Sequence, residues 1–374
     1  MHLKLAFNKG TLLKQERLLH INVDVIRTVA ITAVILLHAA NDLTIRQLNV
    51  WEIFRWCTVD VYQSVGRLGV PLFLLLSGAL LLVPNKVDEP LKVFFKKRWE
   101  RIGLPFIFWG AAFFAWDFLV EQQPVTLNTI IQGILTGPYY HFWYLYLLIG
   151  LYLLTPILRV VVARASSRLI KYLLIIWFVG ATVLPVANLL TTYRLDNNVF
   201  EFTGYAGYFI LGAYLLTIRL RRSTLWIFMT LGIALTAIGT YAIAATIGGA
   251  TMFFFQEYLS PTLILAAVML FLLLNKNVVA SNPKIESTKE PRRVETKNIG
   301  RKLLHLISQN TLPLFLFHVM ILESLQKGYF GITINGNTIN SIIGVPLMTV
   351  IVLFVSLGII IALKKVPILR RLIG

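Results

Sequence analysis

The feature that most constrains this fold is the repetition of long apolar stretches along the chain. Hydrophobic residues make up 57% of the 374 residues, charged residues only 14%, and the mean hydropathy is +0.74. Soluble domains carry about 25% charged residues, whereas a helix that crosses ~30 Å of hydrocarbon needs about 20 apolar residues. The stretches are too continuous for the alternating strands of a membrane β-barrel. We therefore predict an all-α polytopic membrane protein.

The apolar stretches between charged connections predict about ten transmembrane helices in one membrane domain, 21–363. A basic segment, 1–20, precedes this domain, and a basic tail, 364–374, follows it. The segment 275–302 contains prolines and alternating charges, and we expect it to be a cytoplasmic linker between spans eight and nine. The predicted spans are roughly 21–40, 63–83, 102–121, 142–158, 169–190, 203–218, 224–246, 256–274, 304–325 and 341–363.

The distribution of the net charge of +18 predicts how the chain is oriented. With the N-terminus inside, most of the 35 lysines and arginines fall on cytoplasmic segments. The opposite face keeps only Arg46, Arg55, Arg194 and Lys327. By the positive-inside rule, both termini of this multi-pass protein are expected on the cytoplasmic side of the cell membrane. The charge is then topogenic, which argues against nucleic acid as a partner. Cys57 is the only cysteine, so no intramolecular disulfide or Cys-based metal cluster is expected.

Polar residues on the first span predict a site that crosses the bilayer. Arg27 and His38 are eleven residues apart, so on a helix they project from nearly one face, about 16 Å apart along the axis. Ionisable residues at such depth usually face a protein interior or a wet cavity. Asn41 and Asp42 follow one turn later, and Asp42 would orient His38 as a general base. The alternative is an interfacial histidine bonded to a neighbouring span, with Arg27 paired locally to Asp24.

A basic aromatic run, FFKKRWERIGLPFIF, enters the third span. Arg98 and Arg101 are three residues apart in it, so both guanidinium groups can converge on one phosphate. Alternatively, they anchor the helix at anionic headgroups. Further site-lining candidates are Ser77 in the second span, His141 in an aromatic belt and His318 deep in span nine. Each of these also has a purely structural interpretation.

Taken in order, these segments resemble the membrane acyltransferase family 3 of multi-spanning O-acyltransferases. The resemblance rests on Arg-x10-His in the first span, GVPLFLLLSGALLL in the second, RWER entering the third, HFWYLYLLIGLYLLTPILR in the fourth, GYAGYFILGAYL in the sixth and LFLFHVMIL in the ninth. Family members move an acyl group, usually acetyl from cytoplasmic acetyl-CoA, to an extracytoplasmic hydroxyl. The resemblance implies that Arg27 and His38 are essential and that Arg98 and Arg101 help to hold the donor.

The resemblance further predicts acetyl-CoA as acyl donor and a glycan or lipid-linked saccharide of the cell envelope as acceptor. No metal is expected. The chain stops shortly after span ten, so we expect the stand-alone form of the family. Either it acylates its acceptor directly, or a separate extracytoplasmic transferase completes the reaction.

The residues of the first span have expected roles in this reaction. Arg27 would orient the donor or stabilise the developing oxyanion. His38 would activate the acceptor hydroxyl or briefly carry the acyl group, with Asp42 orienting it. Two other functions fit the same residues: a transporter or flippase of a polyprenyl-linked glycan or other anionic substrate, and a scaffold subunit of an envelope assembly.

Overall fold

The structure is a computed structural model that describes residues 22–40, 50–190, 204–247, 249–275, 299–329 and 340–374, together with 331, 333 and 334. The regular structure within these ranges is helical throughout. Large apolar side chains stay exposed along the long helices, and Leu153, Ile238 and Ile343 are 61%, 63% and 64% exposed. A soluble protein rarely presents so much apolar surface to water, so these side chains fit contact with lipid.

Seven described helical segments are long and apolar enough to cross a membrane, or eight if one bent pair counts as a single span. The seven are Ile53–Leu81, Leu91–Leu119, Leu127–Arg164, Ser167–Leu189, Arg222–Thr246, Thr251–Leu274 and Ser341–Leu363. Two predicted spans correspond to shorter helices, α2 (Val23–Ala39) and α12 (Ala206–Leu215). The all-helical membrane fold is thus confirmed, while the count of ten spans and the orientation of the termini stay predictions.

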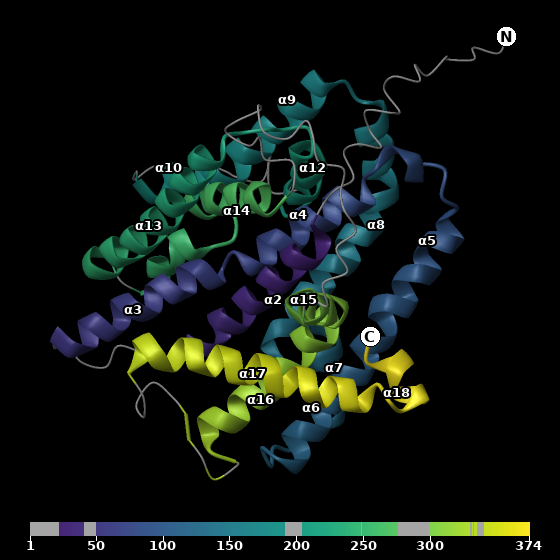
Figure 1. Cartoon of the computed structure of the whole chain (residues 1–374), viewed down its shortest axis with the longest axis vertical. Helices are drawn as coiled ribbons and strands as arrows, with labels where there is room; N and C mark the ends of the chain where they lie inside the picture. Colours follow the sequence, from purple (N-terminus) through teal and green to yellow (C-terminus); the bar gives the residue numbers. More distant parts are fainter. Residues whose placement is uncertain are drawn as a thin grey trace.

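Helix α2 lies in the middle of the other helices (Figure 1). It packs against α3 (Val50–Gly66) and α4 (Gly69–Leu81), which follow it in the chain. It also packs against α15 (Ile299–Gln309), α16 (Thr311–Lys327) and α17 (Ser341–Leu363) near the C-terminus. Because these helices cover it, the polar side chains of α2 meet protein rather than lipid.

Two glycines allow the second and sixth predicted spans to touch through their backbones. A Cβ atom at Gly78 of α4 would lie 2.0 Å from the carbonyl oxygen of Phe209, and one at Gly212 of α12 would lie 2.0 Å from that of Leu75. Any other residue would clash at both positions, so small residues permit this close packing. The glycine-containing motifs of these two spans therefore have a structural role.

The third predicted span contains one wide turn. Helix α5 (Leu91–Arg98) passes into a π-helical turn, Trp99–Gly103, before α6 (Leu104–Leu119) begins. Such turns are rare and often occur at functional sites. Arg98 directly precedes the turn and Arg101 lies within it, so their spacing is not that of a regular α-helix. The other helices are α7 (Leu127–Thr136), α8 (Trp143–Arg164), α9 (Ser167–Phe178), α10 (Leu184–Leu190), α13 (Arg222–Thr246), α14 (Pro261–Leu274) and α18 (Pro367–Leu372).

The ninth predicted span, 304–325, is broken rather than straight. Helices α15 and α16 meet around Asn310 at an angle of 82°. Asn310 occupies the N-cap position of α16, but its side chain donates to the carbonyl oxygen of Leu306 at 2.7 Å rather than capping the helix. Pro313 lies in the first turn of α16, where a missing N–H is tolerated. The break places the start of α16 inside the protein, because Asn310 is only 4% exposed.

The predicted orientation can be tested with cysteines at two exposed positions. Gln123 follows the third predicted span and Ser167 follows the fourth, so the positive-inside rule places them on opposite sides. In a Cys57→Ser background, Gln123→Cys should react with an impermeant thiol reagent in intact cells. Ser167→Cys should react only after permeabilisation. The reverse labelling pattern would invert the topology.

Candidate active site

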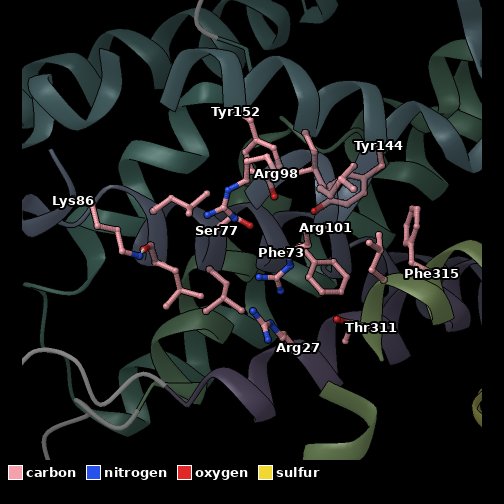
Figure 2. A pocket seen from close by; sticks show the side chains of 16 residues that line it. Arg27, Phe73, Ser77, Lys86, Arg98, Arg101, Tyr144, Tyr152, Thr311 and Phe315 are labelled. Carbon is pink, nitrogen blue, oxygen red and sulfur yellow. Dashed lines mark hydrogen bonds between the residues drawn. The ribbon is translucent and has the colours of Figure 1, made fainter. Parts of the chain in front are cut away.

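A cavity of about 290 Å³ lies between the helices and is lined by several positively charged side chains. It is lined by Arg27 of α2, Lys86 of the turn after α4, and Arg98 and Arg101 at the start of the third span. Figure 2 shows the guanidinium groups of the three arginines directed toward its middle. Ser77 lines the same cavity, and none of the described lining residues is acidic. Positive charge without a carboxylate partner suits a ligand that carries several negative charges.

Aromatic rings support Arg98, and Arg27 and Arg101 repel each other. The guanidinium carbon of Arg98 lies 5.1 Å from the ring centroid of Phe94 and 5.4 Å from that of Tyr152. Its Nε atom is buried and has no hydrogen-bond partner among the described residues. The charge of Arg101 acts unfavourably on Arg27. Oδ2 of Asp24, the local partner considered for Arg27, lies 2.9 Å from Nδ1 of His305, and the Asp24 charge also acts favourably on Arg27. An anionic ligand would relieve this repulsion.

The cavity changes in character from one end to the other. Lys86 lies at one end, and Tyr144 and Phe315 lie at the opposite end (Figure 2). The rings of Tyr144 and Phe315 pack with centroids 5.2 Å apart. The Phe315 centroid is in turn 6.1 Å from that of His318, one turn further along α16. The apolar end of this cationic cavity therefore borders a histidine.

His38 of α2 and His318 of α16 form a hydrogen bond in the interior. Nδ1 of His38 lies 2.7 Å from Nε2 of His318, and the rings stack with centroids 5.0 Å apart. Nδ1 of His318 lies 3.0 Å from the carbonyl oxygen of Leu314, which can only accept a hydrogen bond. When both rings are neutral, His318 keeps its proton on Nδ1, and its Nε2 accepts a hydrogen bond from Nδ1–H of His38. This leaves Nε2 of His38 unprotonated and available as a base.

A second cavity, about 300 Å³ in volume, borders His38 at the end of α2 opposite Arg27. Tyr140 meets the His38 ring edge to face, with centroids 5.4 Å apart. Aromatic faces combined with a few charged groups suit a ligand that has both apolar faces and polar substituents. The lining residues are Leu37, His38, Arg67, Tyr140, Trp143, Tyr205, Glu257 and Tyr258.

His141 lies beside the histidine pair without bonding to it. Its ring centroid is 5.8 Å from that of His318, and its Nε2 lies 3.2 Å from the carbonyl oxygen of Leu316. Its Nδ1 is buried and has no partner within the described residues. Asp42, the predicted orienting residue, lies outside the residues that the structure describes. The observed partner of His38 is the imidazole of His318, which lies in the LFLFHVMIL motif of span nine.

A buried arginine ties the turn that carries Lys86 to helix α8. Arg159 is 2% exposed, and its Nε donates to the carbonyl oxygen of Leu81 at 2.8 Å. Its Nη1 donates to the carbonyl oxygen of Lys86 at 3.1 Å and pairs with Glu89 at 2.9 Å. Lys97 also pairs with Glu89, and these two cations hold the pKa of Glu89 below its usual value. In the sequence, Arg159 is the last residue of the HFWYLYLLIGLYLLTPILR motif, and its link to Lys86 was not predicted.

A family model described as an acyltransferase domain matches residues 20–363, nearly the whole chain. The chain belongs to acyltransferase family 3. The matched range includes the histidine pair and every residue that lines the two cavities. Comparisons with curated proteins and with solved structures give no match. Family 3 membership and the apolar helices together describe a multi-pass membrane protein with an acyltransferase domain.

Proposed function

We propose that this family 3 acyltransferase moves an acyl group, which we take to be acetyl, from cytoplasmic acyl-CoA to a hydroxyl of an extracytoplasmic glycan or lipid-linked saccharide. The observation that carries the proposal is the bond between His38 and His318, because it leaves an unprotonated nitrogen on a residue that lines the second cavity, while its partner His318 lies beside Phe315 of the first. One cavity suits a polyanion, and the other suits a ligand with polar groups and apolar faces.

The cationic cavity suits the donor. Coenzyme A carries its phosphates at the nucleotide end and its thioester at the other end of an uncharged pantetheine arm. Arg27, Arg98 and Arg101 would bind phosphate, and the arm would run past Phe315 toward His38. Arg27 and His38 lie about 16 Å apart along α2, a distance that an extended arm can bridge. Arg27 thus acts on the donor phosphates rather than on the oxyanion, because it lies among the other arginines.

In the proposed reaction, one proton moves from the acceptor hydroxyl to His38 and then from His38 to the leaving thiolate. Nε2 of His38 removes the proton from the acceptor hydroxyl while the hydroxyl oxygen attacks the carbonyl carbon of the thioester. The carbon–sulfur bond breaks, and the leaving thiolate takes the proton from the imidazolium, which gives free coenzyme A and the ester. The bond from Nδ1–H of His38 to His318 strengthens as His38 gains positive charge. His318 is therefore a positioning residue. If His38 carried the acyl group instead, the same nitrogen would attack the thioester.

Release of coenzyme A separates this enzyme from a transporter or flippase, because only the enzyme consumes a thioester. Purified protein, incubated with acetyl-labelled acetyl-CoA and membrane extract, should release coenzyme A and transfer label to a saccharide-containing membrane component. His38→Ala protein is the matched control and should do neither. Equal coenzyme A release by the parent and this variant would contradict the proposal.

The histidine pair makes a prediction about turnover. His38→Ala should lower kcat by about 10²–10⁴-fold, the usual contribution of a general base, without weakening donor binding. His318→Leu should lower kcat by about 10- to 150-fold, because a charge-assisted hydrogen bond is lost. His318→Gln should recover part of this loss, since its amide oxygen can accept from His38. Steady-state kinetics measures these changes. If His318→Leu had the kcat of the parent protein, the bond between the two histidines would have no role in the mechanism.

The arginines make a prediction about donor affinity. Lysine keeps the charge but loses the planar fork, so Arg98→Lys and Arg101→Lys should each weaken acetyl-CoA binding roughly 10- to 150-fold. Calorimetry on detergent-purified protein measures this change. Arg168→Lys, at an exposed position outside the cavity, is the control and should bind like the parent. Parental affinity in both cavity variants would favour the headgroup-anchor interpretation.

A further inference from the structure

Lys86 stands apart from the other cations of the cavity. Figure 2 shows its side chain at the end away from Tyr144 and Phe315, whereas the three arginines meet in the middle. Its Nζ donates one hydrogen bond to the carbonyl oxygen of Leu80 at 2.7 Å, and an ammonium group has three donors. The nearby carboxylate of Glu89 pairs with Arg159 and Lys97. Lys86 therefore keeps donors for a ligand.

The backbone around Lys86 is held in place. Its N–H donates to the carbonyl oxygen of Val83 at 3.1 Å, and its own carbonyl oxygen accepts from the buried Arg159 at 3.1 Å. Arg159 also holds the end of α4 through Leu81. Burial lowers the pKa of Lys86, and the charges of Arg159 and Arg98 lower it further, whereas the carboxylate of Glu89 acts in the opposite direction. A fixed cation among other cations is suited to bind an anion with little reorganisation.

The order of groups along the cavity matches the order of groups along the donor. Aromatic rings at one end suit the uncharged arm, and three arginine forks in the middle suit the diphosphate. The donor has one more phosphate, a monoester on the ribose, at the nucleotide end. We propose that Lys86 forms a separate subsite for this 3′-phosphate. This inference rests on the proposed function, and it adds which cation recognises which phosphate.

The ligand itself supplies the test, since coenzyme A and 3′-dephospho-coenzyme A differ only in this phosphate. Calorimetry on the full-length purified protein should show that the parent binds coenzyme A at least about tenfold more tightly, the worth of one charge-assisted hydrogen bond. Lys86→Met should bring this preference close to one. Lys86→Arg keeps the charge and should retain most of the preference.

Two control variants separate this subsite from the rest of the cavity. Arg98→Lys should weaken binding of both ligands and keep the preference between them. Lys96→Met removes the same charge from an exposed position on α5 that does not line the cavity, and it should keep the preference. Both controls retain Lys86, so a loss of preference confined to the Lys86 variant supports the subsite.

Several outcomes would overturn the subsite. If the parent protein bound both ligands with equal affinity, the subsite would be contradicted. This measurement needs no variant, so it remains decisive even if Lys86→Met does not fold. A parental preference in Lys86→Met would contradict the subsite as well, and both results would leave the proposed donor intact. If the parent bound neither form of coenzyme A, the proposed function itself would fail and the subsite with it.

Discussion

Helix α2 is covered by other helices, yet it carries a guanidinium group near one end and an imidazole near the other. An arginine at membrane depth costs about 2.5–3.5 kcal/mol on insertion scales, so such residues lie where a cavity or a ligand receives them. Arg27 enters a cavity with three further cations, and His38 borders a cavity with four aromatic rings. The chemistry of the site follows from this placement, because one rigid helix sets the distance between the anion-binding region and the base.

The break at Asn310 connects the two regions from a second direction. By turning the chain through 82°, it starts α16 at the cationic cavity, which Thr311 lines, and it places His318 about two turns later against His38. Phe315 lies between these positions and touches both regions. Any shift of α16 would therefore change the donor cavity and the orientation of the base together. A broken helix whose N-terminus faces the binding site of an anionic ligand is a recurring solution inside membrane proteins.

The all-helical membrane fold could be predicted from the sequence because the length of an apolar stretch is a local property. The shared face of the two polar residues on α2 followed from the helical period alone. The bond between His38 and His318 could not be predicted, because 280 residues separate them and only tertiary packing joins them. The sequence instead predicted Asp42, one turn away, as the partner of His38, because sequence patterns show only residues that are near one another in the chain. The break at Asn310 and the tie between Arg159 and Lys86 likewise depend on packing, because the sequence shows neither which arginine is buried nor where a span bends.

The central claim is that a donor anchored by the arginines delivers its acyl group to His38. A structure of the protein with a non-hydrolysable acetyl-CoA analogue tests it most directly. The account predicts the phosphates at Arg27, Arg98 and Arg101, the arm passing Phe315, and the acyl carbon beside Nε2 of His38. An analogue bound with its acyl end away from His38, or with its phosphates outside the cationic cavity, would contradict the account.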